Sequence, residues 1–428
     1  MSKFNAKCVN FMNIERDIGN QITKQIFFAN SLLNRKFANK PAKMIDRILN
    51  TKLLELVKKY PIVTLTGPRQ SGKSTLLQNS FPDYQYVSLE DTDLRLLATE
   101  DPRGFLMTYK DKTIIDEAQR VPSLFSYIQT HTDAQKKEGM YILAGSHNFL
   151  LMESINQSLA GRSAILRLLP FSHQEMKNGG ILPKSTNEEI FFGAYPRLYD
   201  KSIAPEDFYP HYIQTYVERD VRMIKNIGDL SKFIRFLKLC SGRIGQLLNL
   251  SSLANECGIS VSTATVWMSL LEASYIIYLL KPDHNNYAKR LVKTPKLYFY
   301  DTGIACSLLD IRSPEQLSTH YLRGGLFENL VINEFIKASL NKGRDPNITF
   351  WRDSTGNEVD LIQRVAGKQS AYEIKSSATY SKEFFKAISK WAKLSETPPN
   401  RCFTIYNGET TLKTSQGQVM SWKNYTPT

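Results

Sequence analysis

The feature that most constrains the fold of this chain is the string GPRQSGKST at residues 67–75. It has the G-x-x-x-x-G-K-S pattern of a phosphate-binding P-loop, follows the apolar run 62–65 and precedes a stretch that can form a helix. Such a loop joins a buried strand to a helix, because its backbone N–H groups and the helix N-terminus must both face the phosphates. The chain is therefore expected to contain a P-loop α/β domain.

The residue types of this loop have separate roles. Gly67 and Gly72 let the backbone curl so that its N–H groups point at the β-phosphate. The Lys73 ammonium can reach the β- and γ-phosphates, and the Ser74 hydroxyl is placed to bind Mg²⁺. The sequence thus predicts ATP and Mg²⁺ as ligands. The residues expected to bind ATP are Gly67, Pro68, Arg69, Gln70, Ser71, Gly72, Lys73, Ser74 and Thr75.

Residues 44–172 alternate short β-rich runs with helical stretches. Alternation of this kind predicts a parallel sheet covered by helices, with ligands at the carboxyl ends of the strands. The P-loop follows the first of these runs and would lie at that edge of the sheet. The expected strands are residues 62–66, 84–89, 113–115, 140–144 and 164–168.

The third expected strand leads into Asp116 and Glu117. A short apolar strand that delivers two carboxylates suits nucleotide hydrolysis, since the first can hold Mg²⁺ and the second can orient and polarise the attacking water. A strand end followed by a helix cap gives the same string. Its position after the P-loop favours the hydrolytic interpretation, with Ser74 and Asp116 on the metal and Glu117 and Lys73 in catalysis.

Two further polar positions border the fourth and fifth strands. Ser146 or His147, in the string AGSHN, would face the γ-phosphate from a neighbouring strand, although a serine that caps the next helix is an alternative. Arg162 could stabilise transition-state charge in its own site or in that of a neighbouring subunit, an effect worth on the order of 10³ to 10⁵ in rate. The alternative for Arg162 is a surface charge.

Several strings in order resemble a widespread prokaryotic family of AAA-type ATPases that carry a C-terminal domain of uncharacterised function. They are GPRQSGKST, IIDEAQRVP, LAGSHN, SLAGR, LPFSHQEM, FFGAYPRL, YIQTYVERDV, KLYFYDTGI, GGLFENLV and EVDLI. The resemblance covers the chain after Met44. It implies an AAA-type nucleotide-binding domain, in which Ser146 or His147 would be the polar sensor, then a winged helix and then a fold similar to restriction endonucleases.

The expected α/β architecture has five parts along the chain. They are an N-terminal extension (1–43), an AAA-type P-loop ATPase domain (44–172), a helical connector (173–245), a winged-helix domain (246–310) and a restriction-endonuclease-like domain (311–428). The extension lacks the apolar core of a secretory signal and could form an amphipathic helix around residues 22–33, or it could reflect an upstream start. In the connector, Arg219 lies on a packed amphipathic helix or, less favoured, acts as a second arginine finger.

Residues 250–301 have the pattern of a winged helix-turn-helix, with Ser251 as N-cap, Gly258 in the turn and Ser260 opening the second helix. The exposed face of that helix carries Ser and Thr rather than the Arg, Lys, Asn or Gln that read base edges, so specific DNA readout is not expected. The basic side chains of the hairpin that follows could contact DNA phosphates or could simply be exposed to solvent. These side chains are Lys289, Arg290, Lys293 and Lys296.

The last domain carries a second set of charged residues. If residues 358–365 and 370–377 form a hairpin centred on Ala366 and Gly367, Asp360 lies opposite Glu373, and Lys375 falls on the same face. In the restriction-endonuclease-like fold that the resemblance implies, a D…E-x-K triad with a helix glutamate binds Mg²⁺ and activates water on a phosphodiester. The matching positions are Glu328, Asp360, Glu373 and Lys375; the alternative is a Glu373–Lys375 salt bridge without cleavage.

The composition limits the partners and the compartment. Among the 428 residues, 55 Lys and Arg face 41 Asp and Glu, and the net charge of +14 suits an anionic partner such as DNA or simply a soluble basic protein. The longest apolar run in the second half of the chain, residues 275–280, is too short to span a membrane. Scattered cysteines indicate reduced thiols in the cytoplasm and argue against zinc. They are Cys8, Cys240, Cys257, Cys306 and Cys402.

These observations lead to one expected function and two alternatives. The expected function is Mg²⁺-dependent ATP hydrolysis that rearranges the winged-helix and nuclease-like module, with DNA association through the basic wing and the C-terminal domain. The alternatives are an ATP-gated DNA nuclease and a non-catalytic switch that binds ATP and a protein partner. A role of Arg162 in a neighbouring subunit would require an oligomer.

Overall fold

The computed structural model describes residues 45–146, 159–216, 229–283, 292–425 and 427. Contacts separate residues 1–44 from residues 45–428, and all the described residues belong to the second unit. The expected helix at residues 22–33, His147, Arg219, Lys289 and Arg290 lie outside the described residues.

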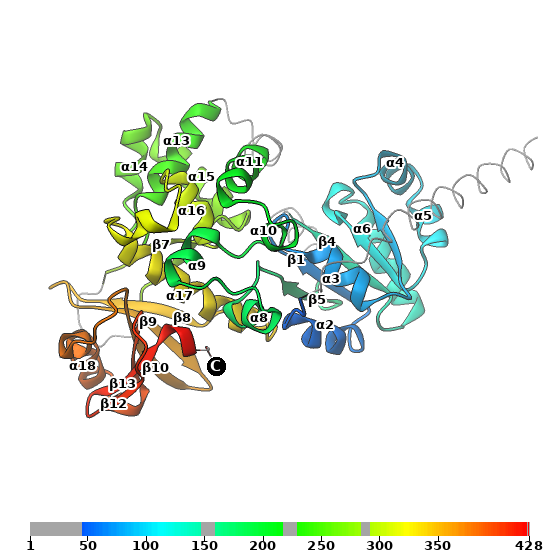
Figure 1. Ribbon diagram of the computed structural model, residues 1–428. Helices are drawn as coiled ribbons and strands as arrows, with labels where there is room; N and C mark the ends of the chain where they lie inside the picture. The colour runs from blue at the N-terminus through cyan, green and yellow to red at the C-terminus, as the bar shows by residue number, and fades with distance from the viewer. Residues whose placement is uncertain (1–44, 147–158, 217–228, 284–291, 426, 428) are drawn as a thin grey trace, which may run out of the picture. The chain divides into compact units, whose positions relative to one another are not determined.

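A five-stranded parallel sheet of order β2-β3-β4-β1-β5 forms the first part (Figure 1). All five expected strands are confirmed, each starting within one residue of its expected position. The strands are β1 (Ile62–Thr66), β2 (Gln85–Ser88), β3 (Thr113–Asp116), β4 (Tyr141–Gly145) and β5 (Ser163–Arg167). The helices are α2 (Leu49–Val57), α3 (Lys73–Ser80), α4 (Thr92–Glu100), α5 (Pro102–Thr108) and α6 (Leu124–Gln135), with the short η1 (Ala118–Arg120).

The sheet is covered on both faces because its strands are apolar on both sides. Val63 and Leu65 pack with α2 and α3, whereas Ile62 packs with α5 and α6 on the opposite face. Ile114 and Ile115 divide in the same way, as expected from the alternation of side chains along a strand. The P-loop therefore leaves the sheet at its carboxyl edge, where β1 ends and α3 begins.

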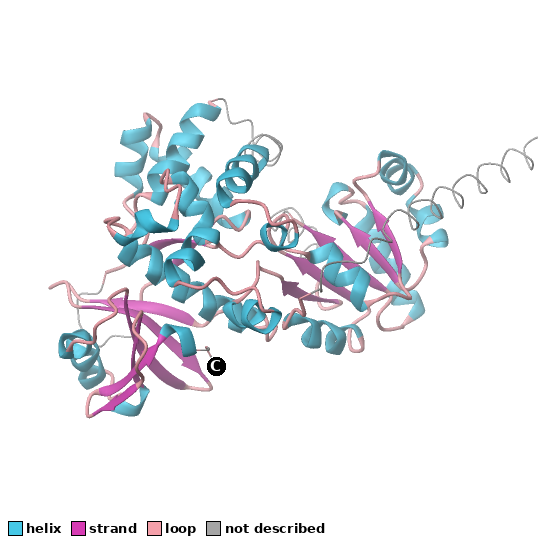
Figure 2. Ribbon diagram, in the orientation of Figure 1, coloured by secondary structure: helices cyan, strands magenta, loops and turns pink. Residues whose placement is uncertain are grey.

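The middle part is mainly helical (Figure 2). Its helices are α8 (His173–Gly179), α9 (Thr186–Phe192), α10 (Pro196–Asp200), α11 (Pro205–Tyr216), α13 (Leu230–Ser241), α14 (Leu250–Cys257), α15 (Val261–Ala273), α16 (Thr302–Leu308) and η3 (Pro314–Ser318). Strands β6 (Ile277–Leu280) and β7 (Lys296–Phe299) pair antiparallel. The expected helix, turn, helix and strand pair are thus present, and a winged-helix function for them stays a prediction.

Local details of this region correct two predictions. Asn249, not Ser251, caps α14, because its side chain accepts from the Ser252 N–H at 3.0 Å. Ser260 caps α15 as expected and accepts from the Thr263 N–H at 3.0 Å. Lys296, expected on an exposed basic wing, is 2% exposed in β7 and cannot contact DNA phosphates there.

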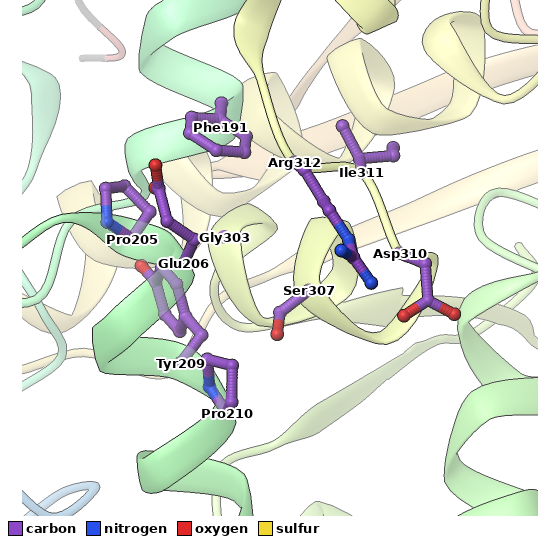
Figure 3. Close-up of a pocket in the computed structure, with 10 residues that line it drawn as sticks. All are labelled: Phe191, Pro205, Glu206, Tyr209, Pro210, Gly303, Ser307, Asp310, Ile311 and Arg312. Atoms are coloured by element: carbon purple, nitrogen blue, oxygen red, sulfur yellow. The ribbon is translucent and has the colours of Figure 1, made fainter.

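Two of the strings that carry the resemblance, FFGAYPRL and KLYFYDTGI, meet in the interior of the protein. Asp301 is 2% exposed and accepts hydrogen bonds from the Tyr209 hydroxyl and the Ala194 N–H, each at 2.8 Å. A Cβ on Gly303 would lie 2.3 Å from the Tyr209 ring, so only glycine fits there. Tyr209 and Gly303 also border a cavity of about 240 Å³ between α9, α11 and α16 (Figure 3).

The last part is a six-stranded mixed sheet of order β12-β13-β11-β10-β9-β8. Its strands are β8 (Ile348–Arg352), β9 (Glu358–Val365), β10 (Lys368–Lys375), β11 (Cys402–Tyr406), β12 (Leu412–Thr414) and β13 (Gly417–Ser421). Its helices are α17 (Arg323–Leu340) and α18 (Lys386–Leu394), with η4 (Lys382–Phe385), η5 (Pro399–Arg401) and η6 (Trp422–Asn424). The two helices pack on opposite faces, since Phe335 of α17 contacts Tyr372 whereas Trp391 of α18 belongs to a core with Ile362.

The β9–β10 hairpin has the predicted register. Lys368 pairs with Val365 and Tyr372 with Leu361, which places Asp360 and Glu373 at the next opposed position. Ala366 and Gly367 both have positive φ, at 49° and 75°, as a two-residue turn that matches the strand twist requires.

No described helix is both long and apolar enough to cross a membrane. The cysteines within the described residues, Cys240, Cys257, Cys306 and Cys402, are buried and form no disulfide.

Candidate active site

The P-loop has the backbone that its sequence predicts. Gly67 and Gly72 have φ of 148° and 92°, and a Cβ on Gly67 would lie 2.1 Å from the Leu168 carbonyl oxygen. Lys73 begins α3 and is 7% exposed. Its ammonium donates to the carbonyl oxygens of Gly67 and Pro68, each at 2.8 Å. The amine is therefore folded over the loop, on the side where phosphates would be cradled.

Ser74 and Asp116 meet at the carboxyl edge of the sheet. The Ser74 hydroxyl donates to Asp116 Oδ2 at 2.6 Å, and the Tyr86 hydroxyl donates to the same oxygen. Asp116 is 6% exposed. Burial and the neighbouring Asp116 raise the pKa of Tyr86 well above its usual range, so this hydroxyl stays protonated. Two oxygen ligands in contact suit Mg²⁺, which prefers oxygen donors.

Glu117 is held in an unusual conformation. Its φ of 53° is left-handed, which for a residue other than glycine costs on the order of 1–3 kcal/mol and is typical of functional sites. Gln119 Nε2 donates to Glu117 Oε2 at 2.5 Å, and the Ser146 hydroxyl lies 3.3 and 3.4 Å from the two carboxylate oxygens. Asp116 Oδ1 accepts from the Glu117 N–H at 3.0 Å. Ser146 therefore lies beside Glu117, as a polar sensor would.

The outside of the loop is braced by Arg47, which sequence reasoning missed. Its guanidinium donates to the carbonyl oxygens of Ser71 at 2.8 Å and Leu169 at 2.5 Å, and to Glu175 Oε1 at 3.2 Å. The group also lies 4.9 Å from the centre of the Phe171 ring. Arg47 thus ties the loop to the segment that follows β5.

Other loop residues have less specific environments. Ser71 is fully buried, and its hydroxyl has no hydrogen-bond partner among the described residues. Gln70 has a left-handed φ of 61°, and Thr75 is exposed on α3. Pro196, the first residue of α10, lies beside the loop, 3.8 Å from where a Cβ on Gly72 would be.

Arg162 is not brought to this site. It precedes β5, whose first residue pairs with Ile62 at the amino end of β1, so Arg162 lies at the edge of the sheet opposite the P-loop. Its guanidinium donates to Asp133 at 2.6 Å on the surface. A role for Arg162 in its own nucleotide site is therefore wrong, and a role in a neighbouring subunit stays a prediction.

The second predicted set does converge. Asp360 Oδ2 accepts from the Ile374 N–H at 2.8 Å, and the Lys375 ammonium lies 2.5 Å from Glu373 Oε1. Burial, with Asp360 acting in the same direction, raises the pKa of Glu373 to about 8. Burial raises the pKa of Glu328 to about 7, against the opposing effect of a lysine.

That lysine is Lys296 of β7, which the sequence did not assign to this set. Its ammonium lies 3.0 Å from Glu328 Oε1 and 3.9 Å from Asp360 Oδ1, and it contacts Glu358. The Tyr298 hydroxyl also donates to Glu328. Glu358 was within reach of sequence reasoning, because it is two residues before Asp360 and so shares its face. No pattern connects Lys296 or Tyr298 to these carboxylates.

Within the described residues, no group of three or more His, Cys, Asp or Glu side chains is arranged to hold a metal ion. The expected Mg²⁺ site at Glu328, Asp360 and Glu373 is thus not formed in this conformation, although the residues are adjacent. Lysine side chains lie among the carboxylates instead.

Three family models match successive parts of the chain. Residues 59–177 match a model described as an AAA domain. This match identifies the P-loop part of the chain as an AAA-type domain. This domain carries the P-loop and the Asp116–Glu117 pair. Residues 183–315 and 323–425 match two domains of unknown function, DUF8612 and DUF4143.

Two mycobacterial proteins that are similar to this chain have names that state no function. Proteins of Mycobacterium bovis and Mycobacterium tuberculosis are each 28% identical over 343 residues, which cover 77% of this chain and 74% of the relative. A Walker-type ATPase of Pyrococcus abyssi aligns with TM-score 0.44 and 14% identity over 64% of this chain and 98% of that one. RuvB of Thermotoga maritima aligns with TM-score 0.30 and 18% identity over 54% and 88%. Neither structure is close enough to carry an argument about function.

Proposed function

We propose that this protein binds and hydrolyses ATP with Mg²⁺. The observation that carries the proposal is the 2.6 Å contact between Ser74 and Asp116, beside a lysine folded over the P-loop and a constrained Glu117. These four groups come from two separate strings, and they are the set that phosphoryl transfer to water requires.

Each of these residues has a defined task in the proposed reaction. Lys73 and the loop N–H groups bind the β- and γ-phosphates. Ser74 and Asp116 would hold Mg²⁺, which when bound neutralises charge on the phosphates. Glu117 accepts a hydrogen bond from the attacking water and takes its proton. Ser146, with Gln119, orients the Glu117 carboxylate toward that water.

Two variants test this assignment. Lys73→Ala is expected to abolish ATP binding in a nucleotide titration, and unchanged affinity would refute the site. Glu117→Gln is expected to keep the affinity for ATP and to lower kcat by about 10²- to 10⁴-fold. Glutamine has nearly the shape of glutamate but cannot act as the base. Glu138→Gln, an exposed glutamate of the same domain, is the matched control and should hydrolyse at the parental rate.

We propose further that the nucleotide state is transmitted to the parts of the chain after the AAA-type domain. The proposed parts are the AAA-type domain (44–172), the helical connector (173–245), the winged-helix domain (246–310) and the nuclease-like domain (311–428). Transmission is supported by the 2.8 Å hydrogen bond between Thr66, which directly precedes the P-loop, and Tyr275, which follows α15. The cysteines within the described residues are buried and form no disulfide, which supports the cytoplasm as the compartment.

An ATP-gated DNA nuclease is the second candidate function. It is favoured by the convergence of Glu328, Asp360, Glu373 and Lys375 on one site. DNA would bind through electrostatic contacts that use the +14 charge, for which Lys293 remains exposed. Nicking of DNA that requires Mg²⁺ and is lost in Asp360→Ala would support this candidate.

The choice between a DNA partner and a protein partner can be tested through ATP hydrolysis. The rate is measured with and without duplex and single-stranded DNA near physiological salt, because basic proteins bind DNA nonspecifically at low ionic strength. Stimulation that persists at this salt supports DNA association. A rate that is indifferent to DNA favours the switch with a protein partner.

A further inference from the structure

The carboxylates of the C-terminal domain surround a lysine that comes from another part of the chain. Lys296 belongs to β7, which pairs with β6, whereas Glu358 and Asp360 lie on β9 and Glu328 on α17. Although Lys296 is 2% exposed, it contacts all three carboxylates. Glu328 and Glu358 lie within hydrogen-bond distance of this ammonium, and Asp360 lies at ion-pair distance, 3.9 Å away.

The formal charges of the whole cluster show what this ammonium does. Four carboxylates face the site, those of Glu328, Glu358, Asp360 and Glu373. The cations on the same cluster are Lys296, Lys375 and Arg352, the last paired with Glu358 at 2.9 Å. With all four carboxylates ionised, as they would be on a bound cation, the balance is −1 with Lys296 and −2 without it. A divalent cation would bring the site without Lys296 to zero.

One atom of the cluster remains without a partner. Glu373 is 7% exposed, and its Oε2 has no hydrogen-bond partner among the described residues, although Oε1 is paired with Lys375. An unpaired buried carboxylate oxygen is costly, and proteins use such groups mainly to bind ions or protons. It provides a free ligand beside Asp360, on the neighbouring strand.

We propose that this cluster is a divalent-cation site in which the Lys296 ammonium occupies the place of the metal. The ammonium pairs with Glu328 and Glu358, offsets the charge of Asp360 from 3.9 Å, and keeps Mg²⁺ and Mn²⁺ out. Removal of the ammonium opens the site to one divalent cation, bound by these carboxylates together with the free Glu373 oxygen. The inference does not rest on ATP hydrolysis, because it concerns residues outside the nucleotide site. It is opposed to the nuclease candidate, which requires Mg²⁺ at Asp360 while Lys296 is present.

The test is a titration of the full chain with Mn²⁺ alone. Binding is measured by electron paramagnetic resonance, as a decrease in the signal of free Mn²⁺. Every protein carries Asp116→Asn, so that the nucleotide site does not contribute. The protein that retains Lys296 is expected to bind no Mn²⁺ at this cluster. The Lys296→Met protein is expected to bind one Mn²⁺ per chain with a Kd tighter than about 10⁻⁴ M, and the additional change Asp360→Asn should remove that binding.

A matched control removes a lysine of the same segment that touches none of these carboxylates. Lys293→Met, exposed and three residues earlier, should leave Mn²⁺ binding absent. A second readout is thermal unfolding, in which Mn²⁺ should raise the Tm of Lys296→Met and leave that of the parent unchanged.

Two results would overturn the proposal. The first is Mn²⁺ binding to the chain with Lys296 intact that disappears in Asp360→Asn, since the lysine would then not exclude the metal. The second is a folded Lys296→Met or Lys296→Gln protein that binds no more Mn²⁺ than its parent. If neither variant folds, the comparison of the Lys296-containing chain with Asp360→Asn still decides whether the metal is excluded.

Discussion

The hydrogen bond between Thr66 and Tyr275 offers a quantitative test of the link between the nucleotide site and the rest of the chain. Thr66 is fully buried and Tyr275 is 2% exposed. The Thr66 hydroxyl lies 3.3 Å from the Leu166 carbonyl oxygen, to which it donates, so the Tyr275 hydroxyl donates to Thr66 at 2.8 Å. Burial raises the pKa of Tyr275 to about 12, and the donor keeps its proton at neutral pH.

The two single variants are expected to differ in cost. Thr66→Val keeps the shape but leaves the buried Tyr275 donor unsatisfied, which costs about 1–3 kcal/mol. Tyr275→Phe removes the donor while Thr66 keeps its bond to Leu166, so the cost is about 0.5–1.5 kcal/mol. In the double variant no donor is left unsatisfied. Its loss should therefore be smaller than the sum of the single losses by about 1 kcal/mol.

The assay is urea unfolding of the parent, the two single variants and the double variant, with ATP hydrolysis measured in parallel. Thr64→Val is the matched control, because Thr64 is buried on the same strand but its hydroxyl bonds to Ser163 at 2.8 Å. Its effect should add to that of Tyr275→Phe. Additive effects for Thr66 and Tyr275 as well would refute the contact, and unchanged hydrolysis in all variants would remove it from the proposed transmission.

Three further variants probe other contacts. Arg47→Met breaks a buried ion pair and the brace on the P-loop, so we expect a loss of about 3–5 kcal/mol in unfolding free energy and weaker ATP binding by titration. Ser146→Ala removes long hydrogen bonds to Glu117. We expect kcat to fall about fivefold, which corresponds to about 1 kcal/mol of transition-state stabilisation, with unchanged ATP affinity. An unaffected kcat would exclude the orienting role. Glu328 and Glu373 keep protons to pH of about 7 and 8 that the unfolded chain releases near 4.5, so stability should fall as pH rises across this window. Glu373→Gln should flatten that urea-measured pH dependence, and an identical slope would contradict the assignment.

The parts of the fold that could be predicted from the sequence are those specified by neighbouring residues. The P-loop and the spacing of apolar runs place β1 and the four other strands of the first sheet. The turn at Ala366 and Gly367 sets the register that brings Asp360 opposite Glu373. In each case a short segment carries both the signal and the geometry.

The contacts that sequence reasoning missed join distant segments. Arg47 reaches the P-loop and the residues after β5, which lie 24 and 122 positions away. Tyr86 reaches Asp116 only because β2 is next to β3. The residues of these two strands do not indicate that the strands are neighbours. The motif of Arg162 allowed a place near the phosphates, a role in a neighbouring subunit or a surface charge, and the register of β5 excludes the first.

The two carboxylate sites show why residue type alone cannot separate a metal site from a charge network. At the P-loop, the hydrogen bonds to Asp116 come from two hydroxyls and a backbone amide, none of which cancels its charge. In the C-terminal domain, Asp360 faces the ammonium of Lys296, and Glu373 faces that of Lys375. A carboxylate bonded to neutral donors still attracts a divalent cation, whereas one bonded to an ammonium is already neutralised. Their different partners therefore predict metal binding at Asp116 and the exclusion of metal at Asp360 and Glu373.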